Sequence, residues 1–80
     1  MNHSSALASQ MDMAQRELAA FLHVVSQEYG PEEAEISVQD WLEEMNLLDC
    51  VRAPTPSDWR IVTIAAASRL SKRLNGRRTD

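Results

Sequence analysis

Eighty residues with 44% apolar and 25% charged side chains have the composition of one globular domain, 1–80, and exclude a chain that is disordered along most of its length. Eight Lys and Arg against twelve Asp and Glu give a net charge of −4, which disfavours non-specific adhesion of the whole molecule to nucleic acid. A single cysteine excludes an intramolecular disulfide, and with no span-length apolar run and no signal-like N-terminus we expect a cytoplasmic protein without a membrane segment.

A first helix is predicted at about 5–29. Its apolar residues are spaced four and three apart, the pattern of a helix with one narrow apolar seam. The seam residues are Leu7, Met11, Ala14, Leu18, Phe21 and Val25. Gly30 and Pro31 end this helix, because glycine readily takes a left-handed cap conformation and proline cannot continue the hydrogen-bond ladder. Residues 1–4 are expected to fray.

A second, short helix is predicted at about 37–50, where Ser37 and Asp40 resemble a capping box. One face is apolar and is predicted to lie in the core: Val38, Trp41, Leu42, Met45 and Leu48. The opposite face is polar and is predicted to face solvent: Gln39, Asp40, Glu43, Glu44 and Asn46. Cys50 follows Leu47 and Leu48 at the end of this helix, so we expect it to be a small buried hydrophobic residue.

The third helix, predicted at about 56–75, has the clearest start in the chain. Thr55 is the expected N-cap, Pro56 takes the first helical position and Asp58 takes the third. The Asn-Gly pair at 75–76 follows a basic last turn and is a typical helix end. Residues 76–80 are therefore expected to fray.

The apolar residues of this third helix complete the predicted fold. Its main stripe consists of Trp59, Val62, Ala66, Leu70 and Leu74. Residues 61–67 are apolar almost all round, so this part is either central in the bundle or buried against another chain. We predict an all-α fold, a compact three-helix bundle in which the first and third helices pack side by side and the second caps or crosses them. Dimerisation through the first or third helix remains an open alternative.

No group of side chains predicts catalysis or a metal site. His23 lies beside the seam of the first helix, and helical spacing places neither Cys50 nor a carboxylate near it. The acidic face of the second helix lacks both the additional oxygen ligands and the Glu-x-x-His pairs that metal sites need. Two glycines cannot form a phosphate-binding glycine loop. We expect a non-enzymatic protein with no cofactor and no metal.

The charges are segregated along the sequence. Residues 28–49 hold eight carboxylates and no base, whereas residues 50–78 hold seven bases against one acid, Asp58. Two such segments either form ion pairs with each other or present oppositely charged faces to partners.

The acidic segment is the first candidate binding site. Carboxylates spaced along a helix can imitate phosphates and occupy a basic groove of another protein, which would make this chain an inhibitor of a protein that handles nucleic acid. The alternative is a solvated face, partly neutralised by the arginines of the same chain. The candidate residues are Glu32, Glu33, Glu35, Asp40, Glu43 and Glu44.

The basic end of the third helix is the second candidate site. Arg69, Lys72, Arg73 and Arg77 can contact DNA phosphates or a partner protein, but bases at a helix C-terminus also complement its dipole without any ligand. The connection before this helix is too long, and the helix start too apolar, for a helix-turn-helix motif.

The function predicted from these patterns is a small protein–protein interaction module: an adaptor, a chaperone-like subunit or an inhibitor that occupies a surface of another protein. Its size and acidic bias would suit an accessory protein of a bacterium or bacteriophage. The alternative is a small DNA-associated regulator that uses the basic end of the third helix.

Overall fold

The computed structural model describes residues 3–48 and 53–78. These residues form three helices, α1 (His3–Tyr29), α2 (Pro31–Leu47) and α3 (Pro56–Arg78), and each helix packs against the other two. The predicted all-α three-helix bundle is confirmed. Residues 1–2 and 79–80, which were expected to fray, and Cys50, which was expected to be buried, lie outside the described residues.

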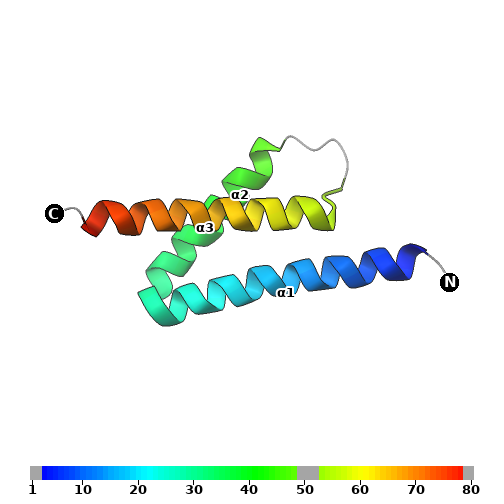
Figure 1. Ribbon diagram of the computed structural model, residues 1–80, viewed down its shortest axis with the longest axis horizontal. Helices are drawn as coiled ribbons and strands as arrows, with labels where there is room; N and C mark the ends of the chain where they lie inside the picture. The colour runs from blue at the N-terminus through cyan, green and yellow to red at the C-terminus, as the bar shows by residue number, and fades with distance from the viewer. Residues whose placement is uncertain (1–2, 49–52, 79–80) are drawn as a thin grey trace.

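Helices α1 and α3 lie side by side and run in the same direction, and α2 crosses both of them obliquely (Figure 1). Helix α2 runs from the end of α1 back towards the end of the bundle at which α3 begins (Figure 1). The N-terminal turns of α1 extend beyond the start of α3 (Figure 1), so that Leu7, although it continues the seam, is 57% exposed. The result is two parallel rods with a third helix laid across one side.

A single residue separates α1 from α2. Gly30 has φ +98° and ψ 165°, and its N–H donates to the carbonyl of Ser26 at 3.0 Å. This conformation is open almost only to glycine, so the predicted end of the first helix is confirmed. The predicted start of the second helix at 37 is wrong, because α2 begins at Pro31. Proline is accepted at the first helical position, where no N–H is needed, and therefore starts this helix as well as ending the previous one.

The start of α3 agrees with the prediction. The backbone N–H of Thr55 donates to the Asp58 carboxylate at 2.8 Å, and the Asp58 N–H donates to the Thr55 hydroxyl at 3.2 Å. This reciprocal pair satisfies N–H groups that have no partner inside the helix. The predicted end at 75 is three residues too early, since α3 continues through Asn75 and Gly76 to Arg78.

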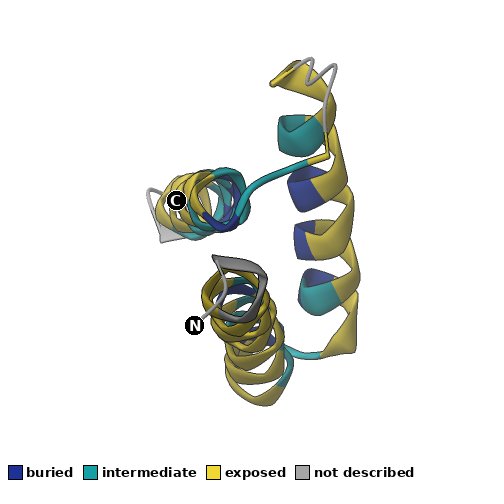
Figure 2. Cartoon of the chain, turned by 90° about the vertical axis from the view of Figure 1, so that its right-hand side faces the viewer, coloured by how far each residue is buried: buried dark blue, intermediate teal, exposed yellow. Residues whose placement is uncertain are grey.

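The core is small and lies where the three helices meet (Figure 2). Trp41 of α2 packs between Val62 and Ala66 of α3 and partly buried residues from all three helices. Its indole N–H donates to the Thr63 hydroxyl at 3.0 Å, and its ring lies 4.8 Å from that of Trp59. The buried apolar residues are Ala14, Val25, Trp41, Val62, Ala66 and Leu70. Apart from Leu7, the seam of α1 and the stripe of α3 therefore face inward, as predicted. Ile61 and Ile64 of α3 are 56% and 69% exposed, so the apolar part of α3 is not covered on all sides within this chain.

Candidate functional site

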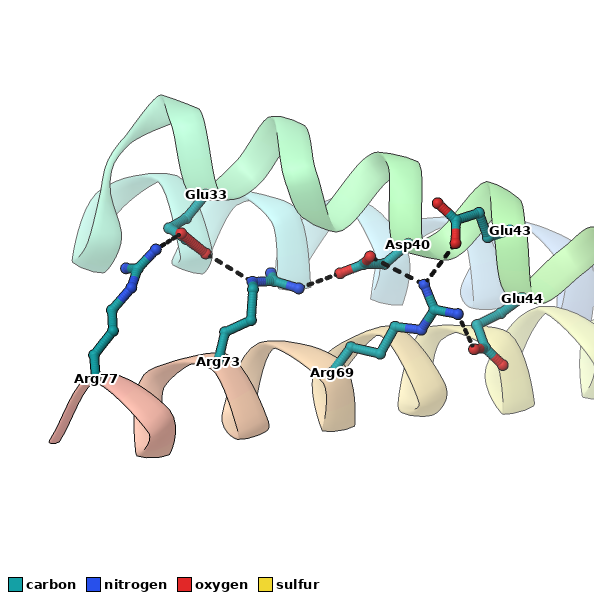
Figure 3. A network of polar contacts seen from close by, with 7 residues as sticks. All are labelled: Glu33, Asp40, Glu43, Glu44, Arg69, Arg73 and Arg77. Carbon is teal, nitrogen blue, oxygen red and sulfur yellow. Dashed lines mark hydrogen bonds and ion pairs between the residues drawn. The ribbon is translucent and has the colours of Figure 1, made fainter. Parts of the chain in front are cut away.

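Helices α2 and α3 are joined by a row of ion pairs, shown in Figure 3. Three arginines, each one helical turn after the last, extend from α3 towards four carboxylates on α2. We call this row the ion-pair ladder. Its members are Arg69, Arg73 and Arg77 on α3 and Glu33, Asp40, Glu43 and Glu44 on α2.

Each arginine of the ion-pair ladder contacts at least one carboxylate, and two arginines bridge neighbouring ones. Arg77 donates to Glu33 at 2.8 Å, and Arg73 reaches the other oxygen of Glu33 at 3.2 Å. Arg73 also donates to one oxygen of Asp40, and Arg69 donates to the other at 3.1 Å. The far end is closed by Arg69, whose guanidinium contacts the carboxylates at 43 and 44 at 3.0 and 2.9 Å. The pairs are thus continuous along the interface between α2 and α3.

Two carboxylates of the ladder are removed from water. The side chains of Glu33 and Asp40 are 6% and 11% exposed. Burial by itself would raise the pKa of Glu33, but hydrogen bonds and charge from Arg77 and Arg73 outweigh it, so this pKa is lowered. Burial likewise opposes the charge of Arg73, yet its bonds to Asp40 and Glu33 raise its pKa. Both partners therefore stay ionised at neutral pH.

Some residues of the predicted acidic site belong to the ion-pair ladder and others do not. Asp40 was predicted to face solvent with Glu44, and that prediction is wrong for both, because Asp40 is buried and Glu44 is partly buried against Arg69. Glu33 is also buried. Glu32 and Glu35 remain exposed and form no ion pair with any described side chain. The remaining acid, Glu43, contacts Arg69 although its side chain is 63% exposed.

The predicted basic site is divided in the same way. Arg69, Arg73 and Arg77 point at α2 and carry intramolecular ion pairs (Figure 3). Lys72 lies on the exposed side of α3, away from the ladder. Four of the eight carboxylates of the acidic segment and three of the seven bases of the basic segment therefore pair with each other in the described part of the chain.

Helix α2 is turned so that polar residues face the bundle. Its buried residues are Glu33, Ser37, Asp40 and Trp41, of which only the last is apolar. Ser37, predicted as an N-cap, lies inside the helix and is fully buried, and its hydroxyl has no hydrogen-bond partner among the described atoms. Pairing the carboxylates with α3 compensates part of the cost of desolvating them. The polar stripe at 33, 37, 40 and 44 has helical spacing and thus forms one continuous inward face.

The large apolar side chains of α2 are exposed as a consequence. Val38 and Leu42, predicted to lie in the core with Leu48, are 37% and 47% exposed. A residue that follows an inward one is rotated by about 100° around the helix, so Val38 cannot point inward where Ser37 does. Ile36 and Leu47 are exposed as well. The core prediction for the second helix holds for Trp41, holds in part for Met45 and is wrong for the other three residues.

The side of α2 that faces away from α1 and α3 is a mixed apolar and acidic surface, which we call the outer α2 surface. It is visible in Figure 2 as the exposed side of that helix. Its apolar and acidic residues are Glu32, Glu35, Ile36, Val38, Leu42 and Glu43. No base occurs anywhere in α2, so nothing within the helix neutralises these acids. The sequence analysis named Glu32, Glu35 and Glu43 as candidate binding residues but placed Val38 and Leu42 in the core, although the polar spacing at 33, 37, 40 and 44 was a usable signal.

His23 and the other metal-ligating side chains do not come together as a metal site in the described part of the chain. His23 is exposed on α1. Within residues 3–48 and 53–78, no three His, Cys, Asp or Glu side chains are grouped closely enough to hold a metal ion. In the same ranges, no helix combines the length and the apolar character needed to cross a membrane.

No protein-family model, no curated protein sequence and no solved structure matches this chain. The surfaces described above are therefore the basis on which a function can be argued.

Proposed function

We propose that this protein is a non-enzymatic, cytoplasmic interaction module that binds another protein through the outer α2 surface. The observation that carries the proposal is the orientation of α2. Three polar residues of that helix are buried, while Ile36, Val38 and Leu42 are exposed. Folding of the single chain thus leaves apolar groups in water that an amphipathic helix would ordinarily bury.

Ile36, Val38 and Leu42 are 39%, 37% and 47% exposed, so a partner that covers them gains at most about half of the free energy of complete burial for each. Complete burial of one Val, Leu or Ile side chain is worth about 1.5–3 kcal/mol relative to full exposure. Val38 and Leu42 lie one turn apart and can contact the same partner segment, whereas Ile36 and Leu47 lie on the other side of the helix. A partner that covers Val38 and Leu42 gains the free energy of burying apolar area that folding leaves exposed, which supports a binding role for α2.

The same geometry disfavours the two nucleic-acid hypotheses. Arg69, Arg73 and Arg77 would each have to leave a carboxylate before gripping a phosphate. Conversely, a role of the acidic segment as a phosphate mimic would have to rely on the acids outside the ladder, since Glu33 and Asp40 are buried and paired. A protein partner that reads the outer α2 surface needs neither rearrangement.

Site-specific crosslinking tests the proposal. A photoreactive amino acid replaces Leu42, and in a matched control it replaces Ser71, which is exposed on α3. Irradiation in extracts of the cells that make the protein should yield a discrete protein adduct from position 42 and not from position 71. Equal adducts from both positions would contradict the proposal. So would retention of duplex DNA by the protein with an affinity that falls steeply as salt is added.

A further inference from the structure

We infer that the segment recognised by the outer α2 surface is an amphipathic helix with large apolar residues along one stripe and Lys or Arg on its flanks. This inference rests on the proposed function and specifies the chemistry of the partner. It follows from the shape of the surface, from its charge and from the way α2 already binds α3.

The shape of the surface fits a rod. Helix α2 has 17 residues and is about 25 Å long. Val38 and Leu42 are stacked along its axis at one-turn spacing, whereas Ile36 and Leu47 lie roughly half a turn around the helix from them and face another direction. A partner helix that runs along α2 can place apolar residues one turn apart against Val38 and Leu42, with its flank beside Glu35, as in other helix-recognition modes.

The negative charge of the surface determines which charge its partner carries. Glu32 and Glu35 are exposed and form no ion pair with any described side chain, and most of the Glu43 side chain is exposed beside Arg69. With no base in α2, a partner that carries Lys or Arg beside its apolar stripe is attracted, whereas acids there are repelled.

The same charge argues against a second copy of this chain as the occupant. In a symmetric dimer built on this surface, each patch meets an identical patch. Glu32, Glu35 and Glu43 of one copy would then approach the same acids of the other, and the whole chain carries a net charge of −4. A basic partner removes this repulsion.

The interface with α3 shows how carboxylates on α2 receive a basic helix. There, arginines spaced one turn apart contact carboxylates of α2 at 2.8–3.2 Å in most of the pairs. The outer α2 surface repeats the combination of acids at helical spacing with neighbouring apolar groups. A second basic helix on the opposite side of α2 would therefore use the same chemistry.

Three synthetic helical peptides test the inference. The first has a leucine stripe flanked by lysines, the second has the same stripe flanked by glutamates, and the third keeps the lysines but has serine in place of leucine. Fluorescence anisotropy gives the affinities, and amide chemical shifts of the protein locate the contact. The lysine–leucine peptide should bind about tenfold more tightly than the glutamate peptide, because of rim charges of modest individual strength, and about tenfold more tightly than the serine peptide, because serine buries no apolar area. The shifts should centre on residues 32–43.

Variants of the protein separate the contribution of the apolar side chains to binding from that of the carboxylates. Leu42→Ser and the double change Glu32→Gln with Glu35→Gln should each weaken the lysine–leucine peptide several-fold, whereas Ile64→Ser, at an exposed site on α3, should leave its affinity unchanged. All of these side chains are exposed, so thermal melting should confirm that each variant is folded.

Three results would overturn the inference: equal affinities for the lysine and glutamate peptides, shifts centred on α1 or α3, or a dimer in sedimentation that Leu42→Ser abolishes. If the crosslink at position 42 forms but the peptides show no preference for lysine, only the chemistry of the partner is wrong. If no crosslink forms at position 42, the proposed function fails as well.

Discussion

Two glycines illustrate how one residue type serves two purposes in this chain. Gly30 has φ +98° at the turn between α1 and α2, in a region where a side chain is strained. Gly76 lies within α3, where glycine only adds conformational freedom to the unfolded chain. An added Cβ would meet no atom within 4 Å at either position, so the difference between them is one of backbone conformation alone.

Alanine at these two positions should therefore change stability in opposite directions. Gly30→Ala should destabilise the protein by about 1–3 kcal/mol, because alanine is strained at this φ and ψ. Gly76→Ala should stabilise it by roughly 0.5–1 kcal/mol, because it raises helix propensity. Urea denaturation of both variants measures the two changes. If both substitutions changed the free energy of unfolding in the same direction, one of the two backbone conformations would be wrong.

The charge of Glu33 makes the stability of the folded protein depend on pH. Its pKa is lowered in the folded protein, since Arg77 and Arg73 outweigh the effect of burial. The resulting stabilisation is present above the unfolded pKa, about 4.3, and is lost as pH falls through the lower folded value. Protonation removes the charge that both arginines contact.

Glu33→Gln should therefore destabilise the protein at pH 7, and the difference from the wild type should shrink below about pH 4.3. Glu35→Gln is the matched control, because Glu35 is exposed and has no ion pair with a described side chain. Urea midpoints between pH 2.5 and pH 7 provide the measurement. A difference for Glu33→Gln that does not depend on pH would contradict the role given to its charge.

At the scale of elements, the orientation of α2 is the feature that distinguishes this bundle. An amphipathic helix usually buries its apolar face, but here the acids at 33, 40 and 44 lie against α3 and much of the apolar face is exposed. Trp41 remains the main apolar contact from α2 to the core. Charge pairing thus determines how α2 is rotated, and one aromatic side chain determines where it crosses.

The same substitution at two leucines tests this orientation. Leu42→Ala should lower the free energy of unfolding by about 1 kcal/mol or less, because Leu42 is 47% exposed. Leu70→Ala should cost about 2–5 kcal/mol, because Leu70 is buried and its removal leaves a cavity. Denaturation curves give both values. A loss at Leu42 as large as that at Leu70 would place the apolar face of α2 in the core after all.

At the scale of the whole molecule, a short chain supports three helices with few buried apolar side chains. Among the described residues, Val25, Trp41, Val62 and Leu70 are the large buried ones, and more large apolar side chains are exposed than buried. A domain of this size has a total stability of about 4–12 kcal/mol, so each core contact represents a large fraction of it. The contact at Trp41 involves all three helices.

Trp41→Ala should consequently remove about 3–5 kcal/mol, through lost burial and the lost hydrogen bond to Thr63. Trp41→Phe keeps most of the apolar contact, loses the hydrogen bond and should cost less. Thermal unfolding followed by circular dichroism would rank the two variants. Equal losses would indicate that the hydrogen bond, and not the packed ring, holds α2 in place.

The sequence by itself determined the helical class, the first helix, the turn at Gly30, and the capping of α3 by Thr55 and Asp58. These features depend on neighbouring residues and on helical periodicity, both of which are local. The sequence also showed that charges are segregated, and it left open whether the two segments meet. Pro31 was misinterpreted because the same residue can follow one helix and begin another.

The tertiary structure alone decided which face of α2 points inward. The helix carries a polar stripe and an apolar stripe, and local rules favour burial of the apolar one. The outcome depends on α3, where Arg69, Arg73 and Arg77 form a row that only the polar stripe can match. These residues lie 26 to 44 positions away from the carboxylates that accept their hydrogen bonds, so their alignment arises only when the helices pack. The exposed outer α2 surface, and with it the candidate binding site, is the result of that long-range match of charge.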